Sequence, residues 1–215
     1  MKTFNRAAIA IALGALFAAQ AHANLLTNPG AETGDLSGWT PGGDAVAPHI
    51  DSGSFDPGIA PHSGSFDFLG GTGLLFTLTQ NVSLSGILDP TTATVSFWQQ
   101  GLNQGATSDN SHVTLDFLDA GGAVISSVST AVVDSHGGSW TEGGGSFAVP
   151  TGTASIDYVM TFNRAVGSDL DSFIDDNSLT VSGPVSSVPE PANAALLVAG
   201  LALIGRLACR RGAAR

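Results

Sequence analysis

The sequence is poor in cysteine and in positive charge. Its single cysteine, Cys209, lies near the C-terminal end, so no disulfide can form among the residues before it. Lys2 is the only lysine, and between residues 24 and 187 one arginine, Arg164, stands against 17 acidic residues, a formal net charge of −16. Such a charge repels nucleic acid and anionic membrane surfaces. Soluble polyanions are disfavoured as well, unless a divalent cation bridges them.

The sequence also lacks the spacings of common catalytic motifs. The histidines of residues 24–182 are scattered singly, with no His-Glu-x-x-His pattern. In Asp134-Ser135-His136 three catalytic residue types are adjacent, but the members of a triad converge from separate elements. With so many acids, a glycosidase-like pair of carboxylates will occur by chance. We therefore expect a protein that is not an enzyme, with a secreted polysaccharide hydrolase as an alternative.

Residues 1–23 are predicted to be a secretory signal peptide. A basic start precedes an apolar run from Ala7 to Ala19, and Ala21-His22-Ala23 has the small-x-small pattern of a cleavage site. Cleavage before Asn24 leaves residues 24–182 as one domain. A domain of that size buries roughly 70% of its unfolded surface, which is enough for a core without disulfides.

Residues 188–215 form a tail that follows a short linker at 183–187. The prolines of Val188-Pro189-Glu190-Pro191 disfavour helix in the residues before them, so a helix can begin only at about Pro191. The apolar run that follows is at the short end of the roughly 17–25 residues that span a bilayer. The tail closes on a basic end, which favours the cytoplasmic side: Arg206, Arg210, Arg211 and Arg215.

The order of these parts resembles the PEP-CTERM sorting signal of Gram-negative bacteria. The resemblance implies processing by an exosortase after transient anchoring in the inner membrane. It also implies a final location at the cell surface, the outer membrane or the extracellular matrix, associated with exopolysaccharide and biofilm. The sorting residues that it implies are Val188, Pro189, Glu190, Pro191, Arg206, Arg210 and Arg211.

Between the signal peptide and the linker, apolar residues recur with a period of two. No segment there shows helical periodicity with caps, and Gly- or Asn-rich turns separate the alternating runs. About nine or ten short strands with this spacing predict an antiparallel sandwich or barrel. The clearest runs are 93–98, 113–118, 124–133, 146–149, 156–162 and 173–181.

Several short motifs resemble galactose-binding-like and carbohydrate-binding-module β-sandwiches. Residues 24–40 pass from a short apolar strand through a Pro-Gly turn and Glu32 to a Gly-Trp turn, with Ala31 where phenylalanine is usual. Residues 62–69 are similar to the Ser-Gly turn and core strand of that family, and Gln80-x-Val82 is a further likeness. The resemblance selects a jelly-roll sandwich. The expected protein is thus an all-β domain flanked by an N-terminal signal helix and a C-terminal hydrophobic helix.

The last predicted strand carries a candidate metal site. Asp175 shares its face with apolar residues, and a buried carboxylate needs a partner. Carboxylate oxygens suit Ca²⁺. The strand resembles the Asp-Asp-x-Ser-Leu ending of the family, which implies a structural calcium held by Glu32, Asp175 and Asp176; the alternative is that these carboxylates face solvent. The residues that alternate onto one face are Phe173, Asp175, Asn177, Leu179 and Val181.

A sugar-binding face is the second candidate site. Trp98, Trp140 and Tyr158 offer rings for stacking on a glycan, although Trp98 alternates with core residues and both faces of its strand are open to it. The preferred interpretation is an exported, non-enzymatic surface or matrix protein. A carbohydrate-binding, lectin-like module is the alternative. An exposed patch of tryptophan or tyrosine favours binding, whereas an aromatic-free surface favours a structural role.

Overall fold

The computed structural model describes residues 23–44, 46–47, 49–56, 58–87, 89–102, 109–134 and 138–183. The predicted signal helix and the whole tail from Val188 lie outside these residues, as does most of the predicted linker. The described part of the chain contains 11 strands and no helix. It accordingly offers no helical segment of the length and hydropathy that crossing a bilayer requires.

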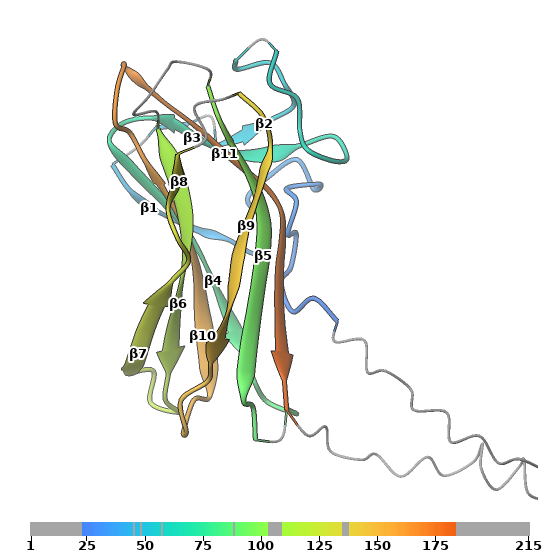
Figure 1. Cartoon of the computed structure of the whole chain (residues 1–215), viewed down its shortest axis with the longest axis vertical. Helices are drawn as coiled ribbons and strands as arrows, with labels where there is room; N and C mark the ends of the chain where they lie inside the picture. The colour runs from blue at the N-terminus through green and yellow to red at the C-terminus, as the bar shows by residue number, and fades with distance from the viewer. Residues whose placement is uncertain are drawn as a thin grey trace, which may run out of the picture.

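The strands form two antiparallel sheets that pack face to face (Figure 1). Sheet A has the order β1-β4-β10-β6-β7, with β8 paired to β6, and sheet B has the order β2-β3-β11-β5-β9. The predicted sandwich is therefore confirmed, and the barrel alternative is wrong. The strands are β1 (Thr40–Gly43), β2 (Ile50–Asp51), β3 (Asp67–Thr72), β4 (Leu75–Ser83), β5 (Thr92–Gly101), β6 (Asn110–Leu118), β7 (Val124–Ser129), β8 (Val133–Asp134), β9 (Thr141–Ala148), β10 (Ser155–Asn163) and β11 (Asp169–Ser182).

The core lies between the inner faces of the two sheets. It forms because alternate residues of β4, β5, β6 and β10 are apolar, and alternate residues of a strand point to the same face. Trp39 closes the core from the N-terminal segment, as a ring packed edge-on against Phe68 and Tyr158. The largest fully buried side chains are Tyr158, Phe68, Phe76, Phe97, Phe117, Phe162, Phe173, Leu69, Leu78, Leu115, Ile156 and Met160.

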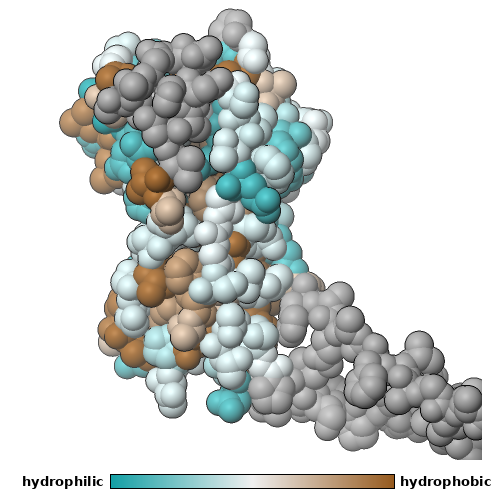
Figure 2. Space-filling view, viewed as in Figure 1, coloured by the Kyte–Doolittle hydropathy of each residue, from teal (hydrophilic) through white to brown (hydrophobic). Residues whose placement is uncertain are grey.

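The edge strand β7 of sheet A carries exposed apolar residues. Val124 and Ile125 of the edge strand β7 are 58% and 42% exposed. In Figure 2, which has the same view as Figure 1, brown atoms appear in the lower half of the molecule, where β7 lies. The predicted strand 124–133 is interrupted, because β7 ends at Ser129 and β8 begins at Val133.

Residues 52–66, apart from residue 57 outside the described part of the chain, run over the outer face of sheet B and are here called the cover segment. Ile59 of this segment packs against Leu69 of β3 and Phe173 of β11 in a second, smaller apolar cluster. Phe68 and Ile174, the chain neighbours of these two residues, point the other way into the main core. The cover segment thus buries part of a sheet face that would otherwise meet solvent, and the candidate site lies beside it.

Candidate functional site

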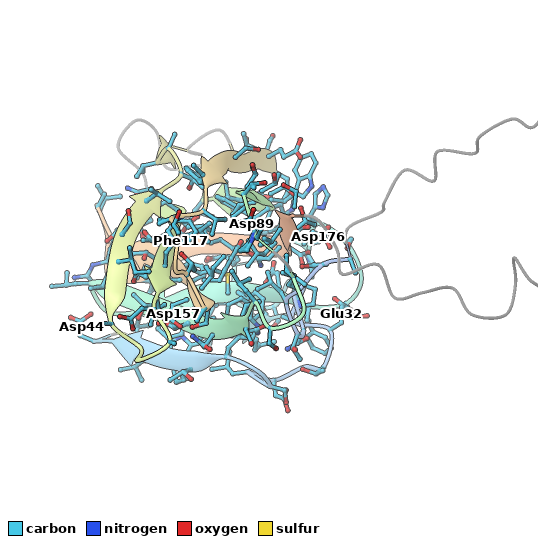
Figure 3. The ribbon with its side chains drawn as sticks, turned by 90° about the horizontal axis from the view of Figure 1, so that it is seen from below. Glu32, Asp44, Asp89, Phe117, Asp157 and Asp176 are labelled. Atoms are coloured by element: carbon cyan, nitrogen blue, oxygen red, sulfur yellow. The ribbon has the colours of Figure 1, made fainter. Side chains whose placement is uncertain are left out.

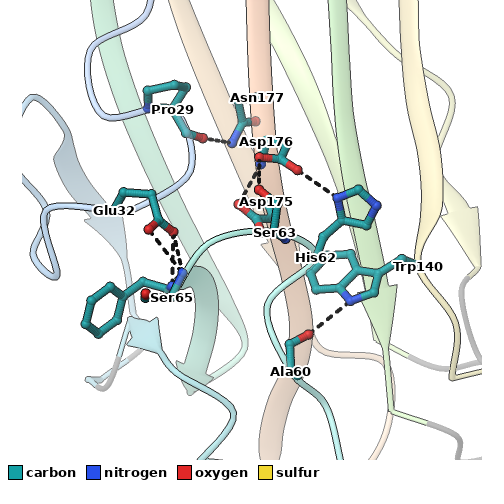
Figure 4. Close-up of polar contacts among 11 residues, drawn as sticks. Pro29, Glu32, Ala60, His62, Ser63, Ser65, Trp140, Asp175, Asp176 and Asn177 are labelled. Carbon is teal, nitrogen blue, oxygen red and sulfur yellow. Dashed lines mark hydrogen bonds and ion pairs between the residues drawn. The ribbon is translucent and has the colours of Figure 1, made fainter.

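The three predicted calcium ligands come from two parts of the chain that lie beside the cover segment. Glu32 follows the Pro-Gly turn of the N-terminal segment, and Asp175 and Asp176 lie in the middle of β11 (Figure 4). Figure 3 shows Glu32 and Asp176 on the same side of the sandwich, away from Asp44. The structure therefore brings together residues that are more than 140 positions apart in the sequence.

A bulge in β11 determines which way these side chains point. The register between β11 and β5 shifts between Asp175 and Ser178, and Asp176 has a left-handed φ of 49°. Aspartate tolerates this conformation better than most residues. The bulge reverses the alternation, so Asp175 and Phe173 lie on the outer face whereas Asn177 lies on the core side. The prediction that residues 173–181 alternate onto one face is therefore wrong.

Asn177 takes the buried position because both polar atoms of its side-chain amide have a hydrogen-bond partner there. Its backbone N–H and its side-chain Nδ2 both donate to the carbonyl of Pro29, at 3.1 and 2.8 Å. Its Oδ1 accepts the hydroxyl of Tyr158 at 2.9 Å. A buried polar group is tolerated when all its hydrogen bonds are made. Asn177 therefore ties the N-terminal segment to β11 and β10, in the place where the family resemblance predicts an aliphatic residue.

Tyr158 is not a glycan contact. Its side chain is fully buried, with an exposed fraction of 0%, and it packs against Trp39. Its strand, β10, lies at the centre of sheet A, and the period-two pattern turns this residue inward. The predicted sugar-binding role of Tyr158 is thus corrected to a role in the core.

The three carboxylates hold the turn at residues 62–66. Glu32 accepts the N–H of Ser65 at 3.0 Å and that of Phe66 at 3.1 Å. Asp175 accepts the N–H of Ser63 at 3.0 Å. Asp176 accepts the Ser63 hydroxyl at 2.7 Å, and its other oxygen lies 2.7 Å from Nδ1 of His62. The side chains therefore dock this turn onto β11 and the N-terminal segment.

The site is strongly negative, and burial disfavours its charge. Asp175 has an exposed fraction of 0%. Burial raises the pKa of Asp175 to about 6 against the lowering effect of the amides of Ser63 and Asp176, and the carboxylates of Asp176 and Glu32 add to the rise. The one ion-pair partner recorded for the three carboxylates in the described residues is His62.

The donor chemistry of this site fits a hard cation. Ca²⁺ accepts carboxylate and backbone carbonyl oxygens, and a carboxylate oxygen that accepts one hydrogen bond keeps a second lone pair. Gly30 lies against the site, and a Cβ there would come within 3.0 Å of the Asp175 Oδ1. No three His, Cys, Asp or Glu side chains stand at metal-ligand spacing in the part of the chain described. Such an ion would therefore rest on two carboxylates completed by carbonyl oxygens.

The two other predicted glycan contacts do come together at this site. Trp98 of β5 pairs in register with Asp175 on one side and with Glu142 of β9 on the other. The His62 ring stacks on Trp98 at a centroid distance of 4.0 Å and meets Trp140 edge-on at 5.6 Å. Both tryptophans are partly exposed. We call Trp98, His62 and Trp140 the aromatic cluster.

The role of His62 was not predicted from the sequence, in which it is one of several scattered histidines. The structure places its ring between the carboxylate of Asp176 and the two tryptophans. The available signal was its position directly before the Ser-Gly turn that resembles the family. Trp140 is also fixed from the cover segment, because its Nε1 donates to the carbonyl of Ala60 at 3.0 Å.

No protein-family model and no curated protein matches the sequence. Among solved structures, the chain is similar to TmCBM61, which was solved in complex with β-1,4-galactotriose. The two chains are 25% identical with a TM-score of 0.52, and the match covers 74% of this chain and 99% of TmCBM61. It is similar to the CBM22-1 xylan-binding domain of Paenibacillus barcinonensis Xyn10C at 16% identity and a TM-score of 0.53, covering 78% and 100%.

A third similar structure is the enzymatically active domain of bacteriophage CBA120 tailspike protein 4, at 16% identity and a TM-score of 0.56. That match covers 74% of this chain but only 21% of the tailspike chain, so this chain spans about a fifth of its length. Carbohydrate-binding modules with a β-sandwich fold are thus structural neighbours of the described domain.

Proposed function

We propose that residues 24–182 form a galactose-binding-like jelly roll that binds a carbohydrate outside the cytoplasm. One observation carries the proposal: the likeness to TmCBM61 extends over 99% of that module at 25% identity, and that module was solved with a bound galactotriose. A binding role is the alternative that the sequence left open, and the partly exposed aromatic cluster favours it over a purely structural role. A fold alone does not fix a function, so the site has to be tested.

We place the glycan contact at the aromatic cluster. Trp98 and Trp140 provide apolar ring surface, and the exposed carboxylate of Glu142 lies beside Trp98 in register. Rings that stack on a sugar together with a few polar groups that orient it are the usual composition of such sites. The charge of −16 over residues 24–187 favours a neutral glycan over a polyuronate.

The test replaces Trp98 and Trp140 with alanine, singly and together, and measures retardation in gels that contain neutral or acidic polysaccharides. Ile125→Ala, on the exposed face of the distant strand β7, is the matched control. The double variant should lose about tenfold or more in affinity, because a ring contact contributes on the order of 1 kcal/mol and 1.4 kcal/mol is tenfold. Unchanged retardation of a double variant that melts as a folded protein would refute this site.

Export and sorting belong to the same proposal and rest on the ends of the sequence. The signal peptide delivers the chain, and an exosortase removes the tail after Val188-Pro189-Glu190-Pro191, leaving a surface or matrix protein without Cys209. Mass spectrometry of the secreted form should find no peptide that reaches Arg215. We propose no enzymatic activity; release of reducing ends from matrix polysaccharide by the purified protein would contradict that.

We also propose calcium at Glu32 and Asp175, supported by the donor chemistry and by the glycine beside it. The ion would offset the repulsion among Glu32, Asp175 and Asp176 and so fix the turn at 62–66. Removing calcium with EDTA should lower the melting temperature of the wild-type protein, and Glu32→Gln should reduce that effect. A melting temperature that does not respond to EDTA or to added calcium would exclude a structural ion.

A further inference from the structure

A second group of acids lies beneath the cover segment and adjoins Asp175. Asp51 of β2 and Asp67 of β3 pair directly in register, so both side chains project from the same face of sheet B. They are 3% and 0% exposed. The strand β11 pairs with the other edge of β3, and because Phe68 pairs with Ile174, Asp175 is the residue of β11 that lies opposite Asp67. Three buried aspartates therefore form a row across β2, β3 and β11.

The side chain of Asp67, the middle residue of this row, has no hydrogen-bond partner. Both carboxylate oxygens of Asp67 are buried and unpartnered, and so is Oδ2 of Asp51. The other oxygen of Asp51 accepts the N–H groups of Ser54 and Phe55, each at 3.0 Å. A buried carboxylate without a partner costs several kcal/mol, so either a bound proton or a cation must offset the charge of this row.

Within the described residues, no lysine or arginine forms an ion pair with this row. The sequence has no lysine after Lys2, and Arg164 donates to the carbonyl of Ser168 in another part of the fold. Burial acts to raise the pKa of Asp51, but the amides of Ser54 and Phe55 together hold that pKa below its usual value. Burial, followed by repulsion from Asp51 and Asp175, raises the pKa of Asp67 to about 8.

A shared proton does not link Asp51 to Asp67. A nearby pair, Asp56 and Asp171, shows the contrast, because their carboxyl groups are joined by a side-chain hydrogen bond. Asp67 repels Asp51 without such a bond. Side chains directly opposite each other in an antiparallel pair have Cβ atoms about 4.5–5.5 Å apart, a separation that an ion with Ca²⁺–oxygen distances of about 2.3–2.6 Å can bridge.

We propose that a calcium ion binds between Asp51 and Asp67, beneath the cover segment, at a site separate from Glu32. Three unpartnered buried oxygens of these two residues face it, and backbone carbonyls complete its shell. The absence of a group of three metal-binding side chains among the described residues does not bear on a site built from two carboxylates. The ion would fasten β2 and the cover segment to sheet B, and so position His62 and the aromatic cluster.

The test measures calcium bound per full-length chain by atomic emission after gel filtration. It compares the wild type with Asp67→Asn, which keeps the shape and removes the charge, and with Glu32→Gln as the matched control. We expect Asp67→Asn to lose one equivalent of calcium, and the double variant to bind less than either single variant. Asp67→Asn protein that retains all the calcium of the wild type would overturn the proposal, as would wild-type protein that binds none.

Thermal melting gives a second readout, on the Glu32→Gln background. At calcium about a hundredfold above its Kd, mass action should raise the melting temperature by about 5–10 °C at pH 8.5, and adding Asp67→Asn should abolish the rise. If Asp67→Asn does not fold, Asp51→Asn replaces it. Calcium should also bind Glu32→Gln protein more tightly as the pH rises from 6 to 8, by up to about tenfold per unit, because the ion displaces a proton. Affinity independent of pH in this range would count against Asp67 as a ligand.

Discussion

Asp67 makes the stability of the calcium-free protein fall as the pH rises. In the folded chain its pKa is about 8, against 3.8 for the free side chain. Between these values the folded state holds a proton that the unfolded state has released, so stability decreases through this window and levels off above pH 8. Replacing Asp67 with asparagine removes the ionisable group while keeping the size of the side chain.

The expected size of this effect is large compared with the stability of a typical domain. A shift of about four pKa units at 1.36 kcal/mol per unit corresponds to on the order of 5 kcal/mol between pH 4 and pH 9. Domains of this kind are stable by about 5–15 kcal/mol in total. Asp175 adds a smaller fall that is complete by about pH 6, where burial places its pKa. Most of the decrease in the free energy of unfolding above pH 6 is thus assigned to Asp67.

The assay is urea denaturation in EDTA at pH 5, 7 and 9, followed by tryptophan fluorescence, to which the buried Trp39 contributes together with Trp98 and Trp140. The free energy of unfolding of the wild-type protein should fall by several kcal/mol between pH 5 and pH 9, and that of Asp67→Asn should fall by much less. Asp89→Asn is the control, because Asp89 is exposed and its left-handed φ of 49° is one that asparagine also adopts. If wild-type and Asp67→Asn proteins show the same pH dependence, the assignment of a neutral, buried Asp67 is wrong.

Two further predictions concern the packing that supports the site. Tyr158→Phe should lower the free energy of unfolding by about 1–3 kcal/mol, because the buried Oδ1 of Asn177 loses its donor; a double-mutant cycle with Asn177→Ala checks the coupling, and additive losses would contradict it. Gly144→Ala should destabilise by about 1–3 kcal/mol, because its φ is 149° and a Cβ would lie 2.2 Å from the Val95 carbonyl oxygen. Gly152→Ala, with a φ of 89° and open space around the Cβ, isolates the effect of φ alone, so equal losses in the two variants would remove the steric explanation.

The sequence by itself determined the class of the fold and the chemical character of the site. Strict alternation in segments such as 113–118 and 156–162 requires one buried and one exposed face, which predicts strands of a two-layered protein. The Pro-Gly turn before Glu32 and the Asp175-Asp176 pair indicated carboxylates near a turn. These are local patterns, and the physical forces that produce them act over a few residues.

Only the tertiary structure decided which of these side chains meet. The bulge at Asp176 reverses the alternation of β11, and no period-two pattern reveals a bulge. Tyr158 and Trp98 look alike in sequence, but the first lies on the inner face of a central strand and the second beside a histidine from a distant turn. The row of Asp51, Asp67 and Asp175 exists because register pairs strands that are far apart in the chain. Register depends on long-range packing of whole faces, so local sequence patterns do not reveal it.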